Sequence, residues 1–139
     1  MTTDTDANAK MKILVVDDSQ MIRDTLKENL ATLGPFHIDT AADGETAVHR
    51  VEIAIKAEAA YDLIFLDWNM PTMDGFVALK LIRAMKSMDK CYIAMLSAES
   101  ESENIKMALA AGANIFVNKP FNLAKLKIFM QNFSKIKKT

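Results

Sequence analysis

The residues best suited to chemistry in this 139-residue chain are five polar side chains that each follow a short apolar run. They are two adjacent acids, a third acid, a hydroxyl and an ammonium: Asp17, Asp18, Asp67, Ser97 and Lys119. Three carboxylates suit Mg²⁺, which prefers oxygen ligands. One carboxylate could accept a phosphoryl group while the hydroxyl and the ammonium hold the phosphoryl oxygens. The set therefore indicates magnesium-dependent phosphoryl chemistry on a carboxylate.

Short apolar segments must bring these side chains together, because the five residues are spread over most of the chain. The segments occupy residues 13–16, 63–66, 92–96 and 115–117, and a member of the polar set closely follows each segment. Such a run is typical of a strand buried on both faces of a parallel sheet. Ligands of these sheets bind just beyond the carboxyl ends of the strands. We therefore expect the polar side chains to meet at one edge of the sheet.

One more strand and five helices complete a predicted alternation of strand and helix. The strand is expected at residues 36–40, after a helix that Gly34 and Pro35 end. Asp43 is a candidate N-cap of a long helix that runs to about residue 60, and Asn122 caps a last helix that runs to about residue 136. This (βα)5 alternation predicts an α/β fold with a parallel five-stranded sheet and helices on both faces.

The helix between the last two strands is predicted from its first turn and its apolar residues. Ser100 and Glu103 match a capping box, in which each side chain satisfies a backbone N–H of the other residue. Ile105, Ala108 and Leu109 are expected to face the core.

Composition excludes several classes of protein. The net charge of −1 gives no large basic field for nucleic acid, and no apolar run approaches the roughly 18 residues of a membrane span. A single cysteine, Cys91, excludes an internal disulfide and suits a reducing compartment, so a cytoplasmic protein is expected. The only histidines, His37 and His49, argue against a histidine-based zinc site.

Four stretches together resemble the receiver domain of two-component signalling, and most closely its single-domain chemotaxis regulators. They are ILVVDDS at 13–19, DWNMPTMDG at 67–75, SAE at 97–99 and KPF at 119–121. The resemblance covers roughly residues 11–135. It implies a doubly wound, flavodoxin-like sheet of order 2-1-3-4-5. We expect a disordered tail at 1–10, a receiver domain at 11–136 and a basic tail at 137–139.

The resemblance assigns a metal site and a phosphoryl acceptor. Asp67 is expected to accept the phosphoryl group. Asp18 and Asp67 are expected to ligate Mg²⁺ directly, with the backbone carbonyl of Asn69 as a third protein ligand and Asp17 acting mainly through water. Three carboxylates and Lys119 carry two net negative charges, which one Mg²⁺ would cancel.

The resemblance also assigns the groups that grip the phosphoryl oxygens and transmit the signal. Ser97 is expected to donate a hydroxyl hydrogen bond, and Lys119 to contribute charge from a chain turned by a cis bond before Pro120. Phe116 stands where family members rotate an aromatic ring on activation, and Phe116, Ser97 and Ile105 are expected to form the switch and its output. Two polar residues, Asn69 and Glu99, flank the path of the water that removes the phosphoryl group, so they are expected to tune dephosphorylation.

The implied function is a signalling switch rather than an enzyme. The protein would be a monomer that takes its phosphoryl group from a histidine kinase or a phosphotransfer protein. Its only catalysis would be its own phosphorylation and dephosphorylation. It would signal by binding a protein target, such as a flagellar motor switch protein. A phosphorelay intermediate that passes the group to a histidine phosphotransfer protein is the alternative.

Three other functions fit the residues less well. A phosphatase of the haloacid dehalogenase type usually carries a second Asp two residues after its nucleophile, where this chain has Asn69. A flavodoxin-like FMN carrier would need a Ser, Thr or Gly phosphate loop in place of Asp17 and Asp18. A receiver that is never phosphorylated should lack a required residue, and none is missing.

Overall fold

The computed structural model describes residues 10–98 and 101–138. The expected N-terminal tail, apart from Lys10, lies outside the described residues, as do Glu99 and Ser100. No helix in the described ranges is long and apolar enough to cross a membrane.

Five parallel strands form one sheet in the order β2-β1-β3-β4-β5, which confirms the predicted fold class. The strands are β1 (Lys12–Val16), β2 (His37–Ala41), β3 (Leu63–Asp67), β4 (Tyr92–Ser97) and β5 (Ile115–Asn118). Their register aligns the carboxyl ends: Val16 pairs with Leu66, Asp67 with Leu96, and Ser97 with Asn118. The residues that follow the strands therefore begin at one edge of the sheet.

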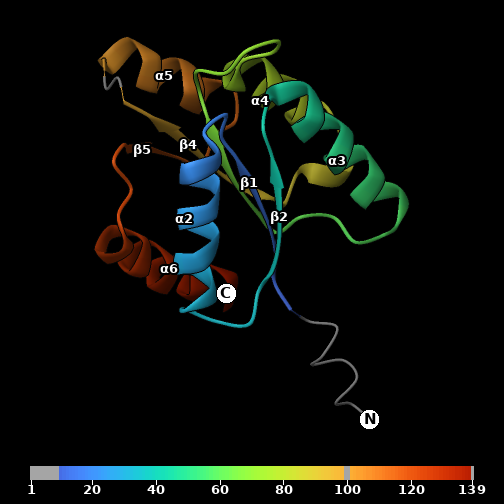
Figure 1. Cartoon of the computed structure of the whole chain (residues 1–139). Coiled ribbons are helices and arrows are strands. Elements are labelled where there is room, and N and C mark those ends of the chain that lie inside the picture. The colour runs from blue at the N-terminus through green and yellow to red at the C-terminus, as the bar shows by residue number, and fades with distance from the viewer. Residues whose placement is uncertain (1–9, 99–100, 139) are drawn as a thin grey trace.

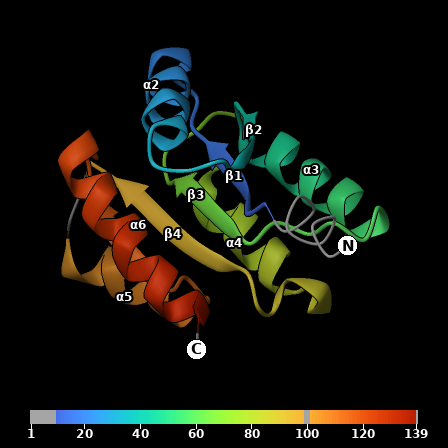
Figure 2. The same cartoon turned by 90° about the horizontal axis from the view of Figure 1, so that it is seen from below.

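Helices cover both faces of the sheet (Figures 1 and 2). They are α2 (Gln20–Ala31), α3 (Gly44–Lys56), α4 (Gly75–Arg83), α5 (Ser102–Ala110) and α6 (Leu123–Lys138), with a short 3₁₀ turn η1 (Lys86–Met88). Buried residues of α2 and α6 join one core cluster, and buried residues of α3, α4 and α5 join the other. The molecule is thus a three-layer α/β structure.

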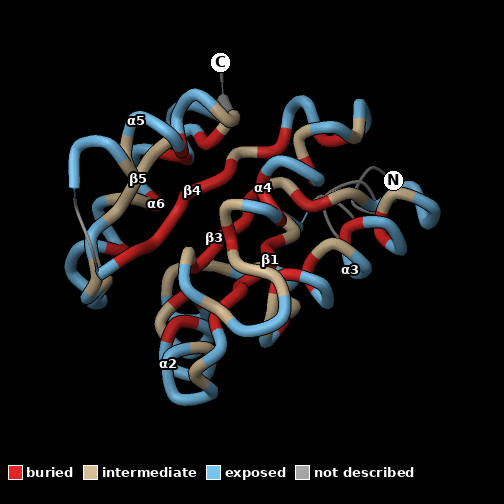
Figure 3. Tube along the Cα trace, turned by 90° about the horizontal axis from the view of Figure 1, so that it is seen from above, coloured by how far each residue is buried: buried red, intermediate tan, exposed pale blue. Residues whose placement is uncertain are grey.

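Alternating residues of each strand fill the two core clusters. Ile13 and Val15 point to the cluster under α2 and α6, whereas Leu14 and Val16 point to the cluster under α3, α4 and α5. All four side chains are at least 99% buried. Figure 3 shows this as continuous buried colour along the inner strands, with exposed colour on the outer turns of the helices. Burial on both faces explains why these strands are continuous apolar runs rather than alternating patterns.

Side-chain caps start several helices where the sequence indicates. Asp43 accepts a hydrogen bond from the Thr46 N–H at 2.7 Å, and Asn122 accepts one from the Lys125 N–H at 2.9 Å. Glu101 holds the N-cap position of α5 and its side chain makes no capping bond. The proposed capping box involves Ser100, which lies outside the described residues.

Two expectations about the helices were wrong, and the end of a third helix differs by two residues. Helix α3 ends at Lys56 rather than near residue 60, because Glu58 adopts a positive φ of 57° that a right-handed helix cannot continue through. On α5, Ala108 is fully buried as expected, but Leu109 is 46% exposed and faces away from the core. Helix α6 continues two residues beyond its expected end, to Lys138.

Candidate functional site

The strand ends place the candidate residues around one point at the edge of the sheet. Asp17 directly follows β1, Asp67 is the last residue of β3, Ser97 is the last of β4, and Lys119 directly follows β5. The Lys119 N–H donates to the Ser97 carbonyl at 2.9 Å, which ties the end of β5 to the end of β4. The structure therefore brings together residues that lie far apart in the sequence.

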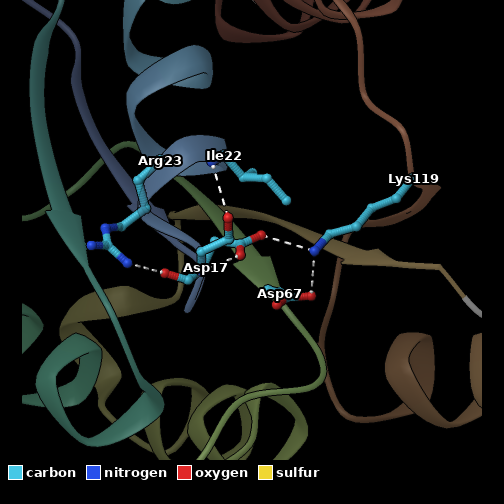
Figure 4. Close-up of polar contacts among 6 residues, drawn as sticks. Asp17, Ile22, Arg23, Asp67 and Lys119 are labelled. Atoms are coloured by element: carbon cyan, nitrogen blue, oxygen red, sulfur yellow. Dashed lines mark hydrogen bonds and ion pairs between the residues drawn. The ribbon is translucent and has the colours of Figure 1, made fainter.

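Lys119 bridges the two buried acids of the site. Its Nζ lies 2.8 Å from Oδ2 of Asp17 and 3.0 Å from Oδ1 of Asp67 (Figure 4). The Asp17 and Asp67 side chains are only 2% and 5% exposed, whereas the lysine side chain is 20% exposed. A buried carboxylate is costly without a partner, so one ammonium stabilises both acids.

Asp18 adds a third carboxylate, which unlike the other two is exposed. One carboxylate oxygen from each of Asp17, Asp18 and Asp67 lies within 4.8 Å of the others. Receiver domains bind Mg²⁺ at such an acidic pocket, and the donor set here is of the oxygen type that Mg²⁺ prefers. The three acids and Lys119 leave a net negative charge that suits a divalent cation, so the residues present fit a magnesium ion.

The electrostatics of the site make Asp67 easier to protonate than an ordinary aspartate. Burial raises the pKa of Asp67 to about 6, and the charges of Asp17 and Asp18 add to the rise while Lys119 opposes it. Burial alone would lower the pKa of Lys119, but hydrogen bonds and charge from Asp17 and Asp67 outweigh it and raise that pKa. Lys119 therefore stays charged, whereas Asp67 is held only weakly in its charged form.

Asp17 is fixed by the first turn of α2. Its Oδ1 accepts a hydrogen bond from the Ser19 N–H at 2.9 Å, and its carbonyl accepts one from Nη1 of Arg23 at 2.8 Å (Figure 4). Ser19 caps α2 by accepting from the Ile22 N–H. The role of Arg23 was missed from the sequence. Its position in the first turn after the Ser19 cap was the only signal for it.

The loop after Asp67 returns to the site through Gly75. The Gly75 N–H donates to the Trp68 carbonyl at 2.7 Å, and a Cβ at position 75 would collide with the Asp67 carbonyl oxygen. Only glycine permits this close approach. Helix α4 therefore begins directly against the backbone of the candidate acceptor.

The remaining candidate residues lie around this centre. Ser97 is 3% exposed, Asn69 is exposed, and the Lys119–Pro120 peptide bond is cis. Phe116 on β5 is half-buried, with its ring centre 6.3 Å from that of Trp68 in an edge-on arrangement. Ile105 on α5 is also half-buried. Glu99 lies outside the described residues.

Comparisons with known proteins agree with this geometry. The response regulator receiver domain family matches residues 13–131. Chemotaxis protein CheY-3 of Vibrio cholerae is 38% identical over 120 residues, covering 86% of this chain and 88% of that protein. The crystal structure of CheY4 from the same species superposes with a TM-score of 0.80 at 35% identity, covering 89% of this chain and 98% of that one.

A second solved structure shows a related protein with a partner. The CheX–CheY–BeF₃–Mg²⁺ complex of Borrelia burgdorferi matches with a TM-score of 0.80 at 33% identity, covering 93% of each chain. These similarities agree with the observed strand order and with the contact of the buried acids with Lys119. The chain therefore belongs to the response regulator receiver family and is a signalling switch of the CheY-like type.

Proposed function

We propose that this protein is a response regulator that accepts a phosphoryl group on Asp67 and binds a partner protein in its phosphorylated form. The observation that carries the proposal is the contact of Asp67 with Lys119 at 3.0 Å, within a cluster that also holds Asp17 and Asp18. Asp67 is the last residue of β3, the central strand of the sheet, whereas Asp17 and Asp18 follow β1.

The transfer itself needs an ionised carboxylate and neutralised phosphoryl oxygens. An oxygen of Asp67 attacks phosphorus, the new O–P bond forms, and the N–P bond to the donor histidine breaks with its electron pair left on the imidazole. Lys119 holds one phosphoryl oxygen by charge, and the Ser97 hydroxyl donates a hydrogen bond to another. Bound Mg²⁺ would supply further positive charge against the oxygens.

We assign the metal ligands residue by residue. Asp18, Asp67 and the carbonyl of Asn69 would hold Mg²⁺ directly, and Asp17 would act mainly through water. One carboxylate oxygen of Asp17 already accepts a hydrogen bond from Lys119, and the other accepts one from the Ser19 N–H. This supports contact of Asp17 with the metal through water rather than directly.

Metal titration followed by Trp68 emission tests this assignment. Asp18→Ala should weaken Mg²⁺ binding far more than Asp17→Ala, because only the first removes a direct ligand. Equal affinities in the two variants would contradict it.

Two polar residues are proposed to set the lifetime of the phosphorylated form. Asn69 and Glu99 lie two residues beyond Asp67 and Ser97, and their side chains would admit the attacking water rather than exclude it. We expect self-dephosphorylation within seconds to minutes. A phosphoryl half-life of many hours in Mg²⁺ buffer would contradict this role.

Chemotaxis is the proposed setting, because the CheY relatives are chemotaxis proteins and one is solved with CheX. The phosphoryl donor would be a histidine kinase or a phosphotransfer protein, and the target a flagellar motor switch protein. A phosphorelay would use the same site but a different partner, so identification of the partner separates the two.

Affinity capture from the cells that make the protein tests the proposed function. The immobilised protein is compared with and without beryllofluoride and Mg²⁺, and Asp67→Asn under the same conditions is the matched control. We expect one protein to be retained only by the activated wild type. A motor switch protein supports chemotaxis, a histidine phosphotransfer protein supports a relay, and identical capture in both states contradicts a switch.

A further inference from the structure

Three aromatic rings, one on α4, one on β5 and one in the loop after β3, form a row beside the candidate acceptor. The Trp68 ring, directly after β3, stacks on the Phe76 ring of α4 with centroids 5.2 Å apart and planes 5° apart. The edge-on contact of Trp68 with Phe116 lies in the same row. Trp68 therefore contacts both α4 and the ring on β5 that the proposed switch would turn.

The backbone of Trp68 is held in place independently of this row. Its N–H donates to the Leu96 carbonyl at 2.9 Å, and its carbonyl accepts from the Gly75 N–H. With the backbone fixed at both ends, the orientation of the indole depends on the groups that it packs against, which include the Phe76 and Phe116 rings. Phe76 immediately follows Gly75, so the stacking ring comes from the turn of α4 that touches the Asp67 backbone.

Phe76 has a second neighbour that favours its position. Nζ of Lys80, one turn further along α4, lies 4.7 Å from the centre of the Phe76 ring, within cation–π range. All three rings are half-buried and pack against the core cluster under α3, α4 and α5. The row thus runs from the surface of α4 to β5.

We propose that Phe76 is a positioning residue of the switch: it holds Trp68 against Phe116, and so couples α4 to the state of Asp67. This inference rests on the proposed function, in which Phe116 turns after phosphorylation. In this proposal, the turn of Phe116 breaks its edge-on contact with Trp68. Because the Phe76 ring restrains the indole, the contact of Trp68 with Phe116 favours the arrangement described here. A less restrained indole weakens this contact and shifts the equilibrium toward the arrangement in which Phe116 has turned.

Thermodynamic linkage between ligand binding and the two arrangements predicts how replacing Phe76 changes the affinity for beryllofluoride. A ligand that favours the turned arrangement binds more tightly when the other arrangement is weakened. Phe76→Leu should therefore tighten the binding of beryllofluoride with Mg²⁺ by about two- to tenfold, the range expected for loss of one aromatic pair. Phe76→Tyr keeps the ring and should behave as the wild type.

The experiment uses Trp68 as its probe, since it is the single tryptophan of the chain. In the unphosphorylated, metal-free protein, acrylamide quenching should increase in Phe76→Leu but not in Phe76→Tyr. Leu81→Ala is the matched control, because Leu81 is an apolar residue of the same helix that is 42% exposed. Phe76→Met replaces Phe76→Leu if the leucine variant does not fold.

Beryllofluoride titrations are then repeated in a Phe116→Leu background, where the effect of Phe76→Leu on affinity should vanish. The inference is overturned if Phe76→Leu leaves quenching and affinity unchanged, if Phe76→Tyr behaves like Phe76→Leu, or if the affinity change persists without Phe116. Failure of the proposed function looks different: wild-type Asp67 takes no phosphoryl label and Trp68 does not respond to beryllofluoride. That result removes the switch, and the role of Phe76 with it.

Discussion

At the scale of single residues, Asp67 combines two demands that oppose each other. As the proposed acceptor, it would have to be ionised to attack phosphorus, yet it is 97% buried beside two other acids, and its pKa is raised to about 6. The ammonium of Lys119, whose Nζ lies 3.0 Å from Oδ1 of Asp67, favours the ionised form of this carboxyl group. The proposed acceptor therefore lowers the stability of the fold, and its proposed function explains why this cost is present.

This cost predicts a pH-dependent effect of Asp67→Asn. A carboxyl group whose pKa is higher in the folded state favours folding when protonated. That stability is present below the ordinary aspartate pKa of about 4 and is lost as pH rises through about 6. In metal-free buffer at pH 7, the free energy of unfolding of Asp67→Asn should therefore be about 1–3 kcal/mol higher than that of the wild type.

Denaturant unfolding at pH 4 and pH 7 in the presence of a chelator measures this difference. The advantage of Asp67→Asn should shrink toward pH 4, where the wild-type carboxyl is protonated. Asp89→Asn controls for the loss of a negative charge at an exposed position. A variant less stable than the wild type at pH 7 would show that the Lys119 contact outweighs the cost of burial.

At the scale of elements, the start of α4 packs directly against the backbone of Asp67, the proposed acceptor at the end of β3. Gly75 is the point of contact, since any side chain there would strike the Asp67 carbonyl oxygen. Gly75→Ala should displace the start of α4, reduce the rate of Asp67 phosphorylation and lower stability by about 2 kcal/mol or more.

Phosphorylation rate and thermal unfolding check this effect. Gly34→Ala is the matched control, because the three atoms nearest to a Cβ at Gly34 all belong to the Phe36 ring, which can move. An unchanged phosphorylation rate in Gly75→Ala would show that α4 does not position the acceptor.

The output side of the molecule belongs to the same scale. The Phe116 ring on β5 packs edge-on against Trp68, and Phe116 is not one of the groups expected to react. Phe116→Ala should therefore leave Asp67 phosphorylation nearly intact and weaken phosphorylation-dependent partner binding. Binding to the partner captured above, measured with and without beryllofluoride, decides this. Unchanged discrimination between the two states would place the switch in another element.

The strand ends and most helix starts could be predicted from the sequence, and the reasons are physical. An apolar run such as residues 63–66 ends where the chain leaves the core, and a cap such as Asp43 is a local signal. The end of α3 could not be predicted, because no Gly or Pro marks it and Glu58 adopts its positive φ without a sequence signal. The stack of Trp68 on Phe76 depends on side-chain orientation and on packing between elements, which residue spacing does not encode.

At the scale of the whole molecule, parallel topology is what assembles the site. β1 and β3 are neighbours at the centre of the sheet, so carboxylate oxygens of Asp17 and Asp67 lie within 4.8 Å of each other, while β5 lies two strands beyond β3. The long side chain of Lys119 spans that distance to reach both acids. The site could be predicted as a set because every carboxyl end of a parallel sheet lies at the same edge.

Phosphorylation of Asp67 is the central claim, and intact-mass measurement tests it most directly. The protein is incubated with a small phosphodonor such as acetyl phosphate and Mg²⁺, and its mass is compared before and after treatment with hydroxylamine. We expect the wild type and Asp89→Asn to gain one phosphoryl group that hydroxylamine removes, and Asp67→Asn to gain none. An unlabelled wild type, or an Asp67→Asn variant labelled as fully as the wild type, would contradict the account.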